Sequence, residues 1–295
     1  MAAARLYRAL VVASGKNSAW VCLEGETAQR PAALRRMTGK RFMPVPGDEV
    51  AVRILEDGAT VIDAVEPRRF SLERRTAGGR AKTMAANVDL LATVTSLGDP
   101  APRLVTLDQL LAFAELESIA ALVVFTKPDR GDPAERERLT ALYHDLGYPV
   151  VVVNAKAGEN VAGLRAALAG HRALLTGVSG VGKSTIFRAL GGEAVVGELS
   201  RHGLGRQTTT TARLYRMGEG FLIDSPGVNE FGLGEIAAAE LAPAFREMAE
   251  PALRCRFTDC THLHEPDCAV QAAVAQGAVA PSRYASFRKI LTEPT

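Results

Sequence analysis

One octapeptide of the chain has the residue types and spacing of a phosphate-binding loop. This octapeptide, GVSGVGKS at residues 177–184, follows the apolar stretch RALLT, and its last two residues open the helical pattern KSTIFRAL, which is the context that such a loop requires. Its glycines allow consecutive backbone N–H groups to turn toward a phosphate, and the helix N-terminus adds a favourable dipole. Lys183 would reach the β- and γ-phosphates of a nucleotide, and Ser184 would supply an oxygen to Mg²⁺. The residues predicted to contact the nucleotide here are Gly177, Val178, Ser179, Gly180, Val181, Gly182, Lys183, Ser184 and Thr185.

A second candidate element, Asp-Ser-Pro-Gly at residues 224–227, comes about forty residues after the phosphate loop. Asp224 ends an apolar stretch and could hold the water shell of Mg²⁺, and Gly227 could offer its N–H to the γ-phosphate. Alone this element could be a simple turn, but its distance from the phosphate loop favours a nucleotide-binding role. Four threonines at 208–211 lie between the two elements, and we favour Thr209 or Thr210 as the one that binds Mg²⁺.

The tetrapeptide Thr126-Lys127-Pro128-Asp129 follows a β-branched run and has the form of the loop with which GTPases recognise guanine. A carboxylate at Asp129 could accept hydrogen bonds from N1–H and the exocyclic amine of guanine, a pair of donors that adenine lacks. Lys127 would lie along the base and brace the phosphate loop. The pattern alone is weak and occurs by chance. The residues predicted to bind the base are Thr126, Lys127, Pro128 and Asp129, with Asn154, Ala155 and Lys156 as a second base-contacting loop.

The order of these elements is unusual, because the base-recognition loop precedes the phosphate loop by about fifty residues. In an ordinary GTPase the phosphate loop comes first. Each element nevertheless lies at the carboxyl end of a predicted strand, where sheets of alternating strands and helices bind their ligands. The order is a cyclic rotation of the usual one, which a fold tolerates because the termini of a domain commonly lie close together. We therefore expect a circularly permuted GTPase domain.

Three of the four cysteines crowd into fourteen residues, in the pattern Cys255-x4-Cys260-x-His262-x5-Cys268. Three thiolates and one imidazole can complete the tetrahedral shell of a zinc ion, and with no position left for water the metal would be structural. His264 is a possible rival to His262. About sixty residues of short helices bury too little surface to stay folded alone, so a metal would stabilise this segment.

The elements that must position these sites fall into four segments. From about Val88 apolar strand patterns alternate with helical patterns such as VTLDQLLAFAELE, which predicts a mostly parallel sheet with helices on both faces. Before it, short β-branched runs separated by turn signals predict a small β-barrel. The expected division is an OB-like, RNA-binding β-barrel at 1–72, a basic linker at 73–84, the α/β GTPase domain at 85–235 and an α-helical zinc domain at 236–295.

The composition limits the class of protein. The chain has 295 residues, 23% of them charged, which is enough for two or three domains. Its apolar runs are too short to span a bilayer and the N-terminus lacks a signal-peptide pattern, so we expect a cytoplasmic protein without a membrane partner. Residues 1–84 carry 15 basic against 9 acidic residues, and the remainder carries 20 against 24. This asymmetry favours an anionic partner such as RNA, although an ordinary solvated surface would carry the same arginines.

Together these features resemble a known family, the circularly permuted, ribosome-small-subunit-dependent GTPase A of bacteria. The resemblance extends over nearly the whole chain and rests on AANVDLL, TKPD, GVSGVGKST, GLGRQTTTTARLY, DSPGVNEFGL and CRFTDCTHLHEPDCAV. It implies GTP hydrolysis coupled to late maturation of the small ribosomal subunit, with rRNA contacts, GTP or GDP with Mg²⁺, and one structural Zn²⁺. It also implies His262, rather than His264, as the zinc ligand. We expect the protein to act as a monomer.

Two positions bear on the rate of hydrolysis. Val228 stands where many GTPases place a water-orienting glutamine, and an apolar side chain cannot orient water. Members of the resembled family commonly carry a histidine just before the threonines, whereas this chain has Gln207, which can hold a water but does not titrate near neutral pH. His202 is a possible substitute. We expect a low intrinsic rate that the small subunit stimulates. The predicted catalytic residues are Lys183, Gln207, Thr209, Thr210, Asp224 and Gly227.

Two other functions stay open at this stage. In a GTP-gated ribosome-binding module, GTP would hold a conformation and hydrolysis would be incidental, as Val228 and Gln207 allow. An ATP-dependent phosphotransferase or nucleic-acid ATPase could use the same phosphate loop, but only if Asp129 had no role. Aromatic residues are sparse in the barrel, so its RNA contacts would depend on basic side chains. These include Arg35, Arg36, Lys40 and Arg41.

Overall fold

The computed structural model describes residues 5–15, 18–34, 43–75, 81–191, 193–194, 213–224 and 236–293. The chain divides into two compact units. The first unit groups residues 1–89, 168–174 and 191–227, and the second groups residues 90–167, 175–190 and 228–295. This grouping crosses the four expected segments, whose boundaries stay a prediction. Among the helices of the described ranges, none combines the length and the apolar character that a membrane span needs.

The first unit is built on a closed five-stranded barrel. β1 pairs with β2 and with β4, and β3 pairs with β2 and with β5. The pairing of β5 with β4 closes the barrel. The strands are β1 (Leu6–Ser14), β2 (Ser18–Leu23), β3 (Gln29–Leu34), β4 (Glu49–Ile54) and β5 (Thr60–Val65). Side chains alternate between the two faces of each strand, which places Val11, Val21, Val50, Val52 and Ile62 together in the barrel core. The predicted OB-like barrel is confirmed.

A β-hairpin follows the barrel in the segment expected to be a linker. Its strands are β6 (Ser71–Arg75) and β7 (Ala81–Ala86). The fully buried carboxylate of Asp48 accepts two hydrogen bonds from the guanidinium of Arg68, at 2.7 and 2.8 Å. After the hairpin, Asn87 donates to the carbonyl oxygen of Gly47 at 2.9 Å. These contacts fix both ends of the hairpin to the turn before β4, although residues 76–80 lie outside the described ranges.

Further strands complete the first unit. β14 (Gly220–Asp224) pairs in parallel with residues 172–174 of β11 (Arg172–Thr176) and antiparallel with β13 (Arg213–Met217). β13 also pairs with β1 and with the short β12 (Glu193–Ala194). The strand expected at the apolar stretch RALLT is therefore confirmed as β11, and Asp224 ends its strand, β14, as expected.

The second unit contains the predicted parallel sheet. β8 (Leu90–Ser96), β9 (Ala120–Thr126) and β10 (Val150–Val153) run parallel, with β9 in the middle. Thr176, at the end of β11, donates to the carbonyl oxygen of Ala92 in β8 at 3.5 Å. All seven residues of β8 are buried, as expected for a strand covered on both faces. The helices that follow these strands are α1 (Leu104–Leu116), α2 (Pro133–Asp145), α3 (Val161–Leu168) and α4 (Lys183–Ala189).

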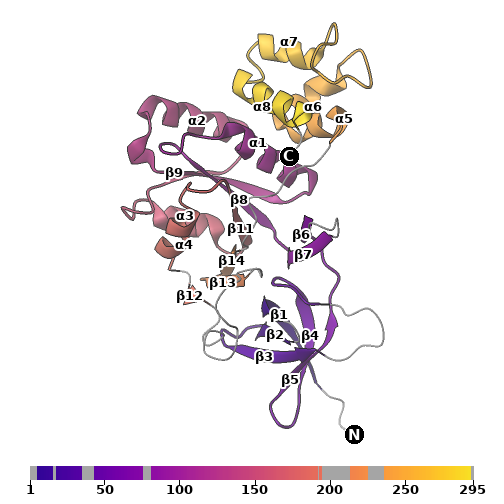
Figure 1. The fold of residues 1–295 in the computed structure, drawn as a ribbon, viewed down its shortest axis with the longest axis vertical. Coiled ribbons are helices and arrows are strands. Elements are labelled where there is room, and N and C mark those ends of the chain that lie inside the picture. The colour runs from indigo at the N-terminus through magenta and orange to yellow at the C-terminus, as the bar shows by residue number, and fades with distance from the viewer. Residues whose placement is uncertain are drawn as a thin grey trace. The chain divides into compact units, whose positions relative to one another are not determined.

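Short helices form the C-terminal part of the second unit. They are α5 (Ala238–Leu241), a 3-10 turn (Ala242–Ala244), α6 (Arg246–Leu253), α7 (Ala269–Ala275) and α8 (Pro281–Thr292). They share a core in which Leu241, Phe245, Met248 and Phe287 have no exposed surface, and Ala112 of α1 belongs to the same core. The C-terminal helices therefore pack on α1, as the ribbon drawing shows (Figure 1).

Candidate nucleotide site and metal centre

The phosphate loop connects β11 to α4 through backbone conformations that glycine adopts most easily. Gly177, Gly180 and Gly182 have φ angles of 132°, 82° and 105°, in the region that other side chains disfavour. A Cβ atom on Gly177 would lie 2.1 Å from a carbonyl oxygen of β8, so the loop passes this close only without a side chain. The Lys183 ammonium donates to the carbonyl oxygens of Gly177 and, at 2.9 Å, Val178. The lysine is thus held against the loop that would cradle the phosphates.

The base-recognition loop leaves β9 directly beside the phosphate loop. Thr126 is 3% exposed, and its hydroxyl donates to the carbonyl oxygen of Val181 at 2.6 Å. Lys127 donates from Nζ to the carbonyl oxygen of Gly180 at 2.8 Å. The partners of these two bonds are 55 and 53 residues apart in the chain. The predicted proximity of the two loops is therefore confirmed.

Asp129 lies in a single turn of 3-10 helix (Pro128–Arg130) that follows this loop. Its carboxylate is 54% exposed and lies 3.9 Å from the guanidinium of Arg130. Its oxygens therefore keep acceptor capacity for a ligand, as guanine recognition requires. The carboxylate of Asp132 caps the first turn of α2 by accepting from the N–H of Ala134 at 3.1 Å, so the loop and the helix share one fixed junction.

A third segment, residues 97–100, lies against the base-recognition loop and was not indicated by the sequence. The carbonyl oxygen of Asp99 accepts a second hydrogen bond from the ammonium of Lys127. A Cβ atom on Gly98 would lie 2.4 Å from the Cβ atom of Arg130, so the two backbones are in close contact. The residue types here are those of an ordinary turn. No local signal distinguishes this segment, and only its position in the fold reveals it.

The second predicted base-contacting loop, residues 154–156, follows β10. Asn154 and Glu159 exchange two backbone hydrogen bonds of 3.1 Å each, which closes a short turn that contains the other two residues. A groove of about 580 Å³ lies between this turn and α2. Its lining includes Pro128 and Asn154 but neither Asp129 nor the phosphate loop, so it is separate from the predicted contacts with the guanine edge.

Several predicted site residues lie outside the described ranges. They are Gln207, Thr209, Thr210 and Gly227, with Val228, His202 and the basic residues Arg35, Arg36, Lys40 and Arg41. The backbone of Asp224 is described, while its side chain lies outside those ranges. Of the predicted Mg²⁺ ligands, Ser184 is placed as an exposed residue in the first turn of α4.

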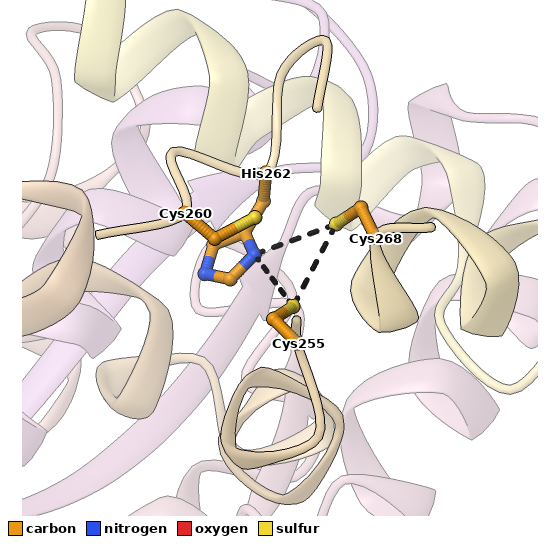
Figure 2. Close-up of side chains that lie close together, drawn as sticks. All are labelled: Cys255, Cys260, His262 and Cys268. Carbon is orange, nitrogen blue, oxygen red and sulfur yellow. Dashed lines mark hydrogen bonds between the residues drawn. The ribbon is translucent and has the colours of Figure 1, made fainter. Parts of the chain in front are cut away.

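The four predicted zinc ligands come together in the C-terminal part of the second unit (Figure 2). The sulfur atoms of Cys255 and Cys268 are 3.9 Å apart, and each lies 3.5 Å from Nδ1 of His262. With Cys260 included, all four ligand atoms lie within 4.8 Å of one another. A tetrahedral zinc ion separates two sulfurs by roughly 3.8 Å and a sulfur and a nitrogen by roughly 3.6 Å. The cluster thus has the size and the donor set of a zinc site, and its imidazole belongs to His262, not to His264.

The surrounding chain holds these ligands in place. The carboxylate of Glu265 accepts hydrogen bonds from the backbone N–H groups of Thr261 and Leu263, at 2.8 and 3.1 Å. The hydroxyl of Tyr284, in α8, donates to the carbonyl oxygen of His262 at 2.6 Å. The loop that carries the imidazole is therefore fixed both by its own carboxylate and by α8.

Burial governs the protonation of the ligands. It raises the pKa of Cys260 to about 12 and lowers the pKa of His262. Zinc needs thiolates and a neutral imidazole. Burial therefore already favours the neutral imidazole that a metal requires, whereas the Cys260 thiol would lose its proton only under the charge of a bound metal ion.

Comparison with known proteins gives concordant matches. The model of the RsgA GTPase family matches residues 65–234. Two relatives, each called small ribosomal subunit biogenesis GTPase RsgA, come from Pseudomonas aeruginosa (strain LESB58) and Haemophilus influenzae (strain 86-028NP). They are 42% and 36% identical to this chain, cover 84% of it in both cases, and are themselves covered over 75% and 74% of their length.

Two solved structures are also similar. The crystal structure of YjeQ from Thermotoga maritima superimposes with a TM-score of 0.80 at 30% identity, over 98% of both chains. The crystal structure of YloQ, described as a circularly permuted GTPase, has a TM-score of 0.76 at 24% identity, over 98% of this chain and 95% of that one. At this identity the second likeness shows the fold alone.

Proposed function

The chain belongs to the RsgA GTPase family, and from this premise we propose that it hydrolyses GTP during biogenesis of the small ribosomal subunit. The observation that carries the proposal is the pair of hydrogen bonds from Thr126 and Lys127 to the phosphate loop. They join the segment that would read guanine to the loop that carries Lys183, within one compact unit. The ribosomal role comes from the relatives, which are called small ribosomal subunit biogenesis GTPases.

We assign the binding roles as follows. Asp129 accepts from N1–H and the exocyclic amine of guanine, Lys127 lies along the base, and the turn at 154–156 closes over it. The phosphate loop and Lys183 hold the β- and γ-phosphates. The Mg²⁺ that accompanies the nucleotide would be held by Ser184, by Asp224, and by Thr209 or Thr210, with the N–H of Gly227 on the γ-phosphate.

The catalytic rate is proposed to be low in the isolated protein. Lys183 and Mg²⁺ would stabilise the charge that develops on the phosphates. Val228 cannot orient the attacking water, which leaves this role to Gln207, with His202 as a possible substitute. We propose that the small subunit orders this segment and thereby stimulates hydrolysis. Val228, which cannot orient water, favours a second candidate function, a GTP-gated ribosome-binding module in which hydrolysis is incidental.

We propose one structural zinc ion at Cys255, Cys260, His262 and Cys268. The distances between the ligand atoms support this assignment, because they match those around a tetrahedral ion. With four protein ligands the ion would have no open position for water. It would therefore contribute folding stability to the short C-terminal helices, not chemistry.

We further propose that the protein acts as a cytoplasmic monomer whose barrel (1–72) and zinc segment (236–295) contact rRNA. The linker (73–84) and the permuted GTPase domain (85–235) would join them. The basic excess of the first 84 residues supports this part of the proposal. Phosphate contacts by lysine and arginine would make the binding strongly dependent on salt.

The decisive experiment measures GTP hydrolysis with and without purified small ribosomal subunits, with ATP as the competing substrate. We expect hydrolysis of GTP to accelerate when subunits are added and ATP to be a poor substrate. Equal GTPase rates in both conditions, with tight GTP binding, would favour the GTP-gated module. Preference for ATP over GTP would overturn the assignment of Asp129.

A further inference from the structure

Four buried polar side chains from four helices form one hydrogen-bonded network in the second unit. We call it the Arg283 network; it consists of Asp108 (α1), Tyr143 (α2), Glu247 (α6) and Arg283 (α8). The guanidinium of Arg283 donates to Asp108 at 2.6 Å and to both carboxylate oxygens of Glu247 at 2.7 and 3.2 Å. The hydroxyl of Tyr143 donates to the same oxygen of Asp108 at 2.7 Å. The side chains of Arg283 and Asp108 are each only 1% exposed.

Such a network is a poor means of gaining stability alone. An apolar cluster of the same volume commonly stabilises a fold as well as a buried ion pair does. Here two carboxylates share one guanidinium. Burial raises the pKa of Asp108, although its interactions with Arg283, Ser286 and Tyr143 lower it. What charge-assisted hydrogen bonds provide is direction, because each one restricts both a distance and an angle. The network therefore fixes how α1 and α2 sit against the C-terminal helices.

Tyr143 connects the network to the base-recognition loop. The centroid of its ring lies 6.0 Å from that of Phe125, and both side chains are fully buried. Phe125 directly precedes Thr126, whose hydroxyl bonds to the phosphate loop. Because protein interiors are close-packed, a displacement of Tyr143 must move Phe125 and, with it, the backbone at the start of the loop.

Asp108 makes a second connection through α1. This helix begins at Leu104, shortly after the segment 97–100. That segment supplies the carbonyl oxygen of Asp99 to the ammonium of Lys127. The base-recognition loop is therefore in contact with two elements, β9 and the segment before α1, and each of them leads to a member of the Arg283 network.

We propose that Arg283, acting through Asp108 and Tyr143, is a positioning residue for guanine recognition. It holds α1 and α2 so that Asp129 meets the base while Lys183 meets the phosphates of the same nucleotide. The proposal rests on the guanine-nucleotide binding proposed above. It adds that base selectivity depends on a residue of the C-terminal helices that touches no nucleotide.

The test compares the binding of GDP and inosine diphosphate to the full chain by titration calorimetry. Inosine diphosphate lacks the exocyclic amine, so the ratio of its Kd to that of GDP reports the contact of Asp129 with that amine. Tyr143→Phe removes the hydrogen bond to Asp108 and keeps the ring against Phe125. Arg283→Lys keeps the charge and loses the planar fork of donors.

The chain offers a matched control at Arg246. This arginine also connects α6 to the same two helices, since it bonds to Glu115 of α1 at 2.7 Å and to the carbonyl oxygen of Gly147, just after α2, at 2.8 Å. It belongs to neither of the two routes to the base-recognition loop. Arg246→Gln therefore weakens the same interface without disturbing Tyr143 or Asp108.

In Tyr143→Phe and Arg283→Lys we expect the Kd for GDP to rise about tenfold and the preference for GDP over inosine diphosphate to fall by a similar factor. We expect kcat at saturating GTP to stay near the wild-type value, and Arg246→Gln to bind GDP within about twofold of wild type.

If Arg283→Lys does not fold, the result for Tyr143→Phe decides the test. A lower unfolding temperature with an unchanged ratio of the two Kd values would overturn the proposal, since a merely structural network predicts it. A wild-type chain that bound neither nucleotide would overturn the guanine-nucleotide assignment as well.

Discussion

The ammonium of Lys127 donates a hydrogen bond to the carbonyl oxygen of Gly180, 2.8 Å away, across 53 residues of chain. This contact joins the loop that would read the base to the loop that would hold the phosphates. A rotated chain order changes which of the two loops comes first, but it does not change which loops meet in the folded sheet. The physical basis for assigning both loops to one nucleotide is therefore a contact, not a motif.

Replacement of the base-reading carboxylate tests guanine selectivity. Asp129→Asn exchanges one charged acceptor for a neutral amide, so two charge-assisted hydrogen bonds to the base are lost or weakened, at a cost of about 3 kcal/mol. We expect the Kd for GDP to rise about a hundredfold, with the unfolding temperature unchanged because Asp129 is exposed. Titration with GDP and ADP checks this. Undiminished affinity for GDP would show that the carboxylate does not contact the base.

The hydroxyl of Thr126 offers a test of the contact between the two loops. Thr126→Val has nearly the same shape but leaves the carbonyl oxygen of Val181 without its donor, which costs about 1–3 kcal/mol in a buried place. We expect GDP affinity to fall roughly fivefold to tenfold. The matched control is Thr126→Ser, which keeps the hydroxyl and should bind within about twofold of wild type. Equal affinity in both variants would mean that this hydrogen bond does not position the loop.

The path of the phosphate loop beside β8 predicts a steric effect. In Gly177→Ala the new Cβ atom would lie 2.1 Å from the carbonyl oxygen of Val94, so the loop must move away from the sheet. We expect GDP binding to fall by a factor on the order of a hundred or more. The control is Gly170→Ala, at φ 77° with nothing within 4 Å of the new atom, which should cost only about 1–2 kcal/mol of stability and leave GDP affinity unchanged. A Gly177→Ala variant with normal affinity would contradict this close approach.

Loss of one zinc ligand should loosen the C-terminal helices. Cys260→Ser removes one of four thiolate or imidazole donors, and the proposed metal shell would stabilise the small core around it. We expect zinc content, measured by atomic emission, to fall from about one ion per chain to near zero, with faster hydrogen exchange across residues 236–293. Cys22→Ser is the control, since this buried cysteine lies in the barrel and should leave the zinc content intact. A structural metal would be ruled out if the wild-type protein contained no zinc after purification and if a chelator left its hydrogen-exchange rates across residues 236–293 unchanged.

Local residue patterns sufficed for most of the strands and for the main motifs. The β-branched runs before Thr126 and Asn154 predict β9 and β10, because such runs suit buried strands. No local pattern indicates β3, since Pro31 and the polar residues before it interrupt any alternation of apolar and polar side chains, and its pairing with β2 and β5 keeps it in the barrel. The hairpin β6–β7 was missed for a related reason. Its anchor is the pair of Arg68 with buried Asp48, which no local pattern reveals.

The candidate site also contains residues that a local sequence pattern reveals and residues that only the folded structure brings together. The phosphate loop and the cysteine cluster carry their chemistry within a few residues, and the sequence therefore predicts the close grouping that the structure has. Arg283, by contrast, looks like a surface arginine in the stretch PSRYASFRK. Its partner Asp108 lies 175 residues earlier, and tertiary packing alone determines that the two meet in the interior.

A crystal structure of the chain with Mg²⁺ and a non-hydrolysable GTP analogue tests the central claim most directly. The claim is that the base-recognition loop and the phosphate loop hold the two ends of one guanine nucleotide. We predict the carboxylate of Asp129 within hydrogen-bonding distance of N1 and the exocyclic amine, and the ammonium of Lys183 on the β- and γ-phosphates of the same molecule. A nucleotide bound to the phosphate loop with its base turned away from Asp129 would contradict the claim.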